Sequence, residues 1–201
     1  MKMTSIDRIL LLLTALLAGY QVAVGINGLG AIPIIVYTIG FGVLLVAALL
    51  MIILGIEVLD SPIVVIIATV IPLSLSLGLF WEHAASYRIP YLLFALTGFL
   101  AVSFTRSIPM RSKLPTILLA VVHGIAGLTI FLLPSILAAN GTMSPSFALV
   151  GLGGALMGLG GLLLSFLKAG RPVLSKETLL RVFPALLLLM TVCFVTGFRY
   201  G

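Results

Sequence analysis

Seven long apolar stretches, separated by short polar segments, set the pattern of the chain. A helix that crosses a bilayer needs about 20 apolar residues at a rise of about 1.5 Å per residue. The pattern therefore predicts an all-α fold, a polytopic transmembrane bundle of seven helices. The fourth stretch is short, so we expect tilt or local thinning of the bilayer around it. The predicted spans are 8–25, 32–57, 62–81, 90–105, 114–137, 145–167 and 179–198.

Small residues recur at every third or fourth position of the sixth stretch, inside an otherwise apolar run. This spacing places them on one face of a helix, where a neighbouring backbone can approach closely in lipid. Gly153 and Gly160 form a second small stripe beside the first, which favours a central helix or a helix that also binds an extra partner. The predicted packing face consists of Gly151, Gly154, Gly158, Gly161 and Ser165, with a GxxxG pair at Gly154 and Gly158.

Composition makes the chain an integral membrane protein with a single domain. Of its 201 residues, 62% are hydrophobic and 8% are charged, whereas about a quarter of the residues in soluble domains are charged. The net charge of +6 comes from basic residues in short loops. Such residues set topology and attract anionic lipids at the inner face, so we expect no nucleic-acid partner. The one cysteine, Cys193, excludes an internal disulfide.

Basic residues gather on one side of the predicted bundle. Nine lysines and arginines fall on that side, and only Arg88 and Arg199 fall on the other. The excess predicts a cytoplasmic N-terminus and a C-terminus outside. The first stretch has an alternative interpretation as a cleaved signal peptide. Its apolar run continues past the usual length and contains Tyr20 and Gln21, which favours a retained helix.

Two parts of the chain have prolines at corresponding positions, near the starts of their spans. Pro33 and Pro62 lie in the first two positions of spans two and three, and Pro115 and Pro145 lie in the first two positions of spans five and six. The similarity indicates a leading helix in 1–30 and triple-helix units in 31–106 and 113–201. A three-helix unit repeated directly must insert upside down the second time, as in many transporters. The alternative is that proline simply favours the first turn of a helix.

His123 is the ionisable side chain expected near the middle of the membrane. It lies nine residues after Leu114, which corresponds to about 14 Å along a helix. Intramembrane ionisable residues are candidates for function. Ala120 and Gly127 share its face, so we expect it to point toward a close helix neighbour. The alternative is a neutral histidine that hydrogen-bonds to a hydroxyl or carbonyl across that contact.

A proline in the third stretch gives a second candidate for a substrate path. Pro72 lies at its centre and is followed by Ser74 and Ser76. An interior proline frees a carbonyl, and nearby hydroxyls can line a polar pocket at mid-depth. The alternative is an ordinary kink in which the hydroxyls bond back to the preceding turn.

Polar and aromatic residues also gather at the end of the bundle expected to lie outside. They form a candidate ligand or metal entrance, although a solvated loop is the simpler interpretation. The loop residues are Trp81, Glu82, His83, Tyr87 and Arg88, joined by Gln21, Asn27 and Tyr37.

The chain lacks several residue patterns that membrane pumps and enzymes need, and this limits the kinds of function that it can have. No Asp, Glu, Lys or Arg lies at the middle of a predicted span, which argues against coupling through a buried carboxylate. No residues have the spacing of a metal site or of a nucleophile with its base, so we expect no metal, no cofactor and no enzyme. The pattern favours a small transporter or facilitator for an uncharged or amphipathic solute, with a path between the two triple-helix units. The alternative is a non-catalytic subunit or scaffold that packs on other membrane subunits or on its own copies.

Overall fold

The computed structural model describes residues 3–108, 112–168, 170 and 173–201. This part of the chain contains seven long helices that are apolar enough to cross a membrane, and no strand, which confirms the predicted multi-pass bundle. The long helices are α1 (Ser5–Val24), α2 (Ala31–Leu54), α3 (Pro62–His83), α4 (Arg88–Ser107), α5 (Leu114–Ala139), α6 (Ala148–Lys168) and α7 (Lys176–Tyr200). Short 3₁₀ turns, η1 (Ile56–Asp60), η2 (Ala85–Tyr87) and η3 (Pro145–Phe147), precede α3, α4 and α6.

The helix ends follow local sequence signals. Thr4 caps α1, where the Asp7 backbone N–H donates to Thr4 Oγ1 over 3.2 Å and the Thr4 N–H donates to Asp7 Oδ2 over 2.8 Å. This reciprocal pair satisfies two backbone donors of the first turn. The fourth span is longer than predicted, because η2 and α4 together give a 23-residue apolar segment from Ala85 to Ser107. Its length no longer requires a thinner bilayer.

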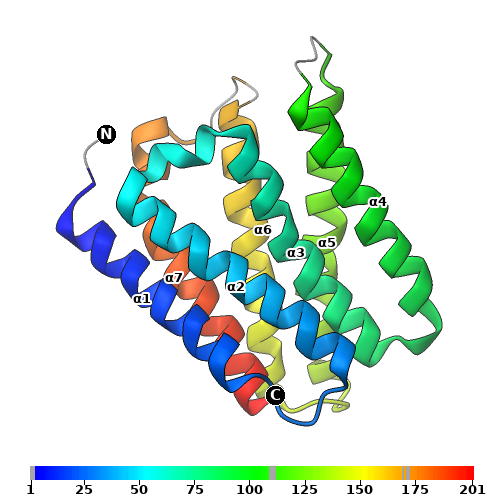
Figure 1. Ribbon diagram of the computed structural model, residues 1–201. Coiled ribbons are helices and arrows are strands. Elements are labelled where there is room, and N and C mark those ends of the chain that lie inside the picture. The colour runs from blue at the N-terminus through cyan, green and yellow to red at the C-terminus, as the bar shows by residue number, and fades with distance from the viewer. Residues whose placement is uncertain (1–2, 109–111, 169, 171–172) are drawn as a thin grey trace.

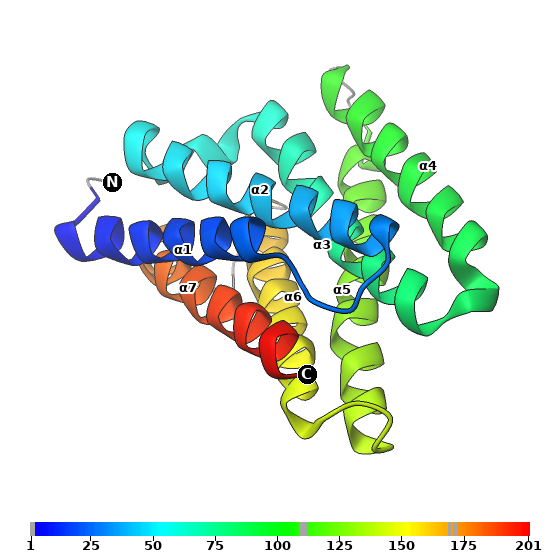
Figure 2. The ribbon, with the colours of Figure 1, turned by 60° about the horizontal axis from the view of Figure 1, so that its bottom comes forward.

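Six helices form a closed ring, and the seventh lies outside it. Going round the ring, α1 contacts α2, then follow α3, α5, α6 and α7, and α7 contacts α1 again. Helix α4 packs on the outside, against α3 and α5 (Figures 1 and 2). The ring keeps apolar side chains on its outer surface, such as Leu16, Leu128 and Leu189, as contact with lipid requires.

The two ends of the bundle carry different residues. We call the end that carries Lys113, Lys176 and Arg181 the basic end, and the end that carries Trp81 and Tyr200 the far end. At the basic end, Lys176 Nζ lies 3.1 Å from Asp60 Oδ2, and both side chains are exposed. Exposed pairs of this kind contribute about 0–1 kcal/mol, so this one mainly joins η1 to the start of α7.

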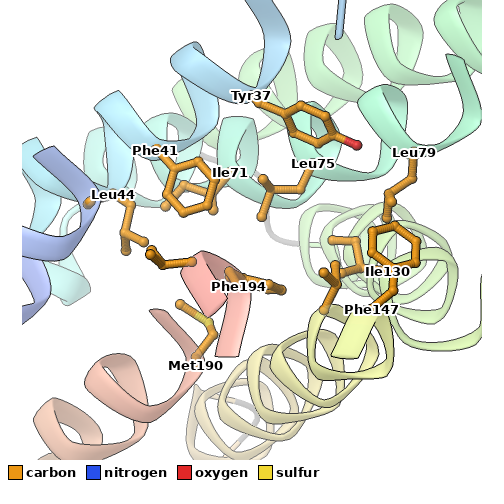
Figure 3. Close-up of a cluster of buried hydrophobic side chains, with 13 residues drawn as sticks. Tyr37, Phe41, Leu44, Ile71, Leu75, Leu79, Ile130, Phe147, Met190 and Phe194 are labelled. Carbon is orange, nitrogen blue, oxygen red and sulfur yellow. The ribbon is translucent and has the colours of Figure 1, made fainter. Parts of the chain in front are cut away.

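Aromatic and aliphatic side chains fill the middle of the ring. The rings of Phe41 on α2 and Phe194 on α7 meet edge to face with centroids 6.4 Å apart. Leu75 of α3 and Met190 of α7 pack into the same cluster (Figure 3). Edge-to-face pairs are favourable beyond the area that they bury. This cluster therefore joins the two sides of the ring, although α2 and α7 are not neighbours within it.

Helix α3 is enclosed at one end and partly open at the other. Residues 71–79, toward the far end, are all buried, whereas residues 62–68, toward the basic end, are all half-buried or exposed. The contrast arises because α4 and α5 both pack against the second half of α3. Helix α3 is thus enclosed most completely toward its far end.

The glycines of α6 face two neighbours. A Cβ at Gly154 would lie 2.7 Å from the Ile130 carbonyl carbon of α5, and a Cβ at Gly153 would lie 2.6 Å from the Phe194 ring of α7. A Cβ at Gly158 or Gly161 would meet nothing within 4 Å, so the two members of the GxxxG pair differ. The second small stripe packs within the chain, because a Cβ at Gly160 would lie 2.5 Å from Leu186 of α7.

Candidate functional site

The predicted path residues of α3, Pro72, Ser74 and Ser76, are all buried. Ser76 Oγ donates hydrogen bonds to the carbonyls of Pro72 (2.6 Å) and Leu73 (3.2 Å), both in its own helix. Ser74 is 8% exposed and packs against α2, since its Cβ would lie 3.3 Å from a Cβ at Gly40. Ser76 thus follows the alternative in which the hydroxyl bonds back to the preceding turn.

His123 also satisfies its polar group within its own helix. Its Nδ1 lies 3.1 Å from the Leu119 carbonyl oxygen of α5, which differs from the alternative interpretation of a bond across the helix contact. The close neighbour lies one turn away, where a Cβ at Gly127 would be 4.0 Å from Gly158 Cα. The ring reaches its own backbone more easily than a partner helix that carries no side chain at this point. A role for His123 in a path stays a prediction.

We expect His123→Leu to change solute uptake by less than twofold, because its one hydrogen bond is local. Proteoliposomes that contain the variant and the parent protein at equal density provide the comparison. A tenfold or larger fall in the uptake rate, with unchanged helix content, would contradict this expectation and indicate that His123 lines the solute path.

Two buried polar atoms near the basic end have no partner. Ser103 Oγ and Arg106 Nε are covered, yet neither has a hydrogen bond in the part of the chain that the structure describes. They lie three residues apart on α4, hence on one side of the helix, and Arg106 is within electrostatic range of His123. The sequence alone does not reveal this pair, because Arg106 is one of the nine basic residues whose position also fits a role in topology.

The far end contains two adjacent cavities of about 150 Å³ and about 10 Å³. They lie between the end of α1, the loop that follows it, α2 and the end of α7, and they share Gln21, Gly25 and Ile26. We call the two together the far-end crevice. Tyr20, Val24, Asn27, Phe198, Arg199 and Gly201 complete the lining of the larger cavity. Ile34, Tyr37, Thr38 and Phe41 complete the lining of the smaller one.

The crevice brings together part of the predicted entrance and leaves the rest elsewhere. Gln21, Asn27 and Tyr37 line it, whereas none of the five loop residues from Trp81 to Arg88 does. Arg88 instead donates from Nε to the Trp81 carbonyl over 2.5 Å. Neither cavity is lined by His123, Pro72, Ser74 or Ser76.

Gln21 holds the wall of the crevice in place. Its Nε2 donates to the Gly25 carbonyl over 2.8 Å. Gly25 ends α1 with a φ of 70°, a left-handed backbone conformation that glycine adopts without strain. The chain therefore turns sharply away from α1 at Gly25, and the following loop forms one side of the larger cavity.

Two polar atoms of residues that line the crevice have no hydrogen bond to the described part of the protein. Gln21 is 6% exposed and Tyr37 is 3% exposed. Neither Gln21 Oε1 nor the Tyr37 hydroxyl has a hydrogen bond within residues 3–108, 112–168, 170 and 173–201. Buried polar groups nearly always have a partner, and ordered water or a ligand supplies it where the protein does not. The smaller cavity is about the least volume that holds one water.

Aromatic rings close the floor of the crevice. The ring centroids of Tyr37 and Phe198 are 4.7 Å apart, and those of Phe41 and Phe198 are 6.2 Å apart. These rings come from α2 and α7, which belong to different predicted triple-helix units. The crevice thus has polar residues such as Gln21 and Asn27 in its lining and ends on aromatic rings that α2 and α7 contribute from the two sides of α1.

The described residues offer little support for a metal site. They contain no group of three or more His, Cys, Asp or Glu side chains that could hold a metal ion. No protein-family model, curated protein or solved structure matches this chain. The seven apolar helices in the described part of the chain show a multi-pass integral membrane protein.

Proposed function

We propose that the protein is a small transporter or facilitator, and that a solute enters through the far-end crevice. The observation that carries this proposal is the pair of adjacent cavities, both of them lined by Gln21 and the smaller one also by Tyr37. Polar side chains in a cavity wall offer hydrogen bonds to water or to a polar solute. A bundle that only needs to pack has no use for such a cavity.

The position of the crevice fits a path between the two triple-helix units. Its floor joins Tyr37 and Phe41 of the first unit to Phe198 of the second. In this arrangement the path is closed below the floor, and passage requires these rings to move apart. The solute is uncharged or amphipathic, because it must pass an apolar constriction after a polar mouth.

The alternative is a non-catalytic subunit or scaffold of a larger assembly. The buried Ser76 favours it, since its hydroxyl bonds within its own helix and the residue lines neither cavity of the crevice. The small stripe with Gly153 and Gly160 no longer argues for an extra partner, because it packs against α7. A homo-oligomer and anionic lipids at the basic end are compatible with either function.

Uptake of glycerol into proteoliposomes, followed by light scattering, tests the transport proposal. We expect Gln21→Leu to lower the rate about tenfold, because a polar solute loses a partner worth about 1.4 kcal/mol at the mouth. Thr97→Val is the control, since Thr97 is exposed on α4 and bonds only within its own helix. This variant should keep the parent rate.

Two results would oppose transport. Uptake equal to that of empty liposomes removes the transport activity for small polar solutes. Native mass spectrometry of the gently solubilised protein then decides the alternative, because other polypeptides bound at fixed stoichiometry support a subunit.

A further inference from the structure

Ser103 and Arg106 lie on the border between the packed side and the lipid-facing side of α4. Val102 is buried against the bundle, whereas Leu100 and Phe104 are 64% and 62% exposed. Successive residues of a helix are about 100° apart around its axis, which places positions 103 and 106 on the flank between these two faces. Both residues are half-buried. A molecule bound at this flank therefore contacts the protein and the surrounding lipid at once.

The hydrogen-bonding groups of these two residues are not satisfied within the described protein. Ser103 Oγ and Arg106 Nε are covered and have no hydrogen-bond partner in residues 3–108, 112–168, 170 and 173–201. Thr97 and Thr105 of the same helix differ, because their hydroxyls donate to carbonyls one turn earlier. Buried polar groups nearly always have a partner, and bound water or an ion supplies it where the protein does not. Two unpartnered donors three residues apart therefore indicate a ligand with acceptor oxygens.

The helices that pack against α4 bring no acidic residue to Arg106. These helices are α3 and α5, and their one acidic residue, Glu82, lies in the last turn of α3 at the far end. Arg106 acts electrostatically on His123 of α5 instead. The positive charge of Arg106 therefore favours an anion as the ligand. The other acidic residues belong to α1, η1 and α7 and interact there, Asp7 with Thr4, Glu57 and Asp60 with Lys176, and Glu177 with Arg181.

We propose that this flank of α4 binds the phosphate of an anionic phospholipid from the leaflet at the basic end, with Arg106 and Ser103 as donors. A guanidinium presents parallel N–H donors that match two oxygens of a phosphate, and the Ser103 hydroxyl donates to the same group. Because the two atoms are covered, the flexible arginine side chain must turn toward the lipid on binding. Neither residue lines the far-end crevice, so this inference goes beyond the proposed function and holds whether or not the protein transports a solute.

The depth of Arg106 matches the headgroup layer of a bilayer. The apolar segment from Ala85 to Ser107 has 23 residues, which corresponds to about 34 Å along a helix, against about 30 Å for the hydrocarbon core. Arg106 lies in its last turn, hence at the border between hydrocarbon and headgroups. Lys113 is exposed just before α5 at the same end and adds to the attraction for anionic lipid.

Native mass spectrometry of the full chain in detergent micelles, titrated with short-chain lipids, tests the site. We expect dioctanoyl phosphatidylglycerol, which is anionic, to bind about tenfold more tightly than zwitterionic dioctanoyl phosphatidylcholine. Arg106→Gln should lower the affinity for phosphatidylglycerol about tenfold, and Ser103→Ala about threefold, because the first removes a charge-assisted contact and the second a single hydroxyl donor. Arg106→Lys should restore only part of the affinity, since lysine keeps the charge but lacks the parallel donors.

Arg8→Gln is the matched control, because it removes the same charge from an exposed residue in the first turn of α1, also at the basic end. It should keep the affinity within about twofold of the parent, since salt screens exposed charges. Fluorescence of Trp81, the one tryptophan of the chain, reports whether each variant is folded. The proposal is overturned if the two lipids bind the folded parent equally, or if Arg8→Gln and Arg106→Gln lose the same affinity.

Free glycerol 3-phosphate distinguishes a lipid from a soluble phosphate compound, because it has the phosphate but no acyl chains. Added at the same concentration as the lipid, it should leave the bound phosphatidylglycerol unchanged, since the acyl chains supply much of the binding. Displacement of the lipid by this compound would assign the site to a soluble phosphate and overturn the lipid as its occupant.

Discussion

Phe194→Ala is expected to lower the free energy of unfolding by about 3–5 kcal/mol, the usual cost of removing a buried phenylalanine side chain. The Phe194 ring is fully buried at 0% exposure and lies edge-on to Phe41. The space cannot close easily, because the ring packs against a glycine. A Cβ at Gly153 would lie 2.6 Å from the Phe194 ring, so the α6 side of the space has no side chain to fill it.

Phe104→Ala provides the control for this loss. Phe104 lies on the outer helix α4 and is 62% exposed, so its removal should cost less than about 1 kcal/mol. Unfolding by denaturant in detergent micelles, followed by Trp81 fluorescence, measures both variants. Equal losses for the two would show that the aromatic cluster does not hold the ring together.

Gly154→Ala is expected to destabilise the bundle by about 1–3 kcal/mol, whereas Gly158→Ala should be neutral or slightly stabilising. A Cβ at Gly154 would lie 2.7 Å from the Ile130 carbonyl carbon and the Phe131 nitrogen. These are backbone atoms of α5, which cannot rotate away, so α5 and α6 must separate. At Gly158 a Cβ meets nothing within 4 Å, and alanine is the better helix former.

The same denaturation experiment separates the two glycines. Equal stability of Gly154→Ala and the parent would show that α5 and α6 are not in this close contact. A loss at Gly158 as large as at Gly154 would instead favour a neighbour along the whole small stripe, such as a second copy of the chain.

Hydropathy predicted the seven helices because the bilayer imposes a length that the sequence must match. The lateral arrangement could not be predicted, since lipid-facing and protein-facing sides are both apolar in a membrane helix. Nothing in residues 88–107 therefore marks α4 as the helix outside the ring. The stripe of glycines identified a packing helix, but not that Gly154 would meet a backbone and Gly158 would not.

The candidate site was predicted in part. Gln21, Asn27 and Tyr37 were recognisable as polar residues at the far end of their spans, and they line the crevice. Arg199 was counted only as a topology signal, because charge at a span end has the same sequence pattern whether or not it faces a cavity. The alternative in which His123 bonds across the helix contact was wrong for Nδ1, because a carbonyl four residues earlier is always within reach in a helix.

The uneven enclosure of α3 has a mechanical consequence. Residues 71–79 of this helix are held by neighbours on every side, whereas residues 62–68 have few neighbours. The helix is therefore fixed at one end and less constrained at the other. Thermal opening begins where the fewest contacts must break, so amide hydrogen exchange should be fastest in the first turns of α3. Any rearrangement that opens the far end must first break the contacts around residues 71–79. Opening the far end therefore requires more free energy than opening the basic end.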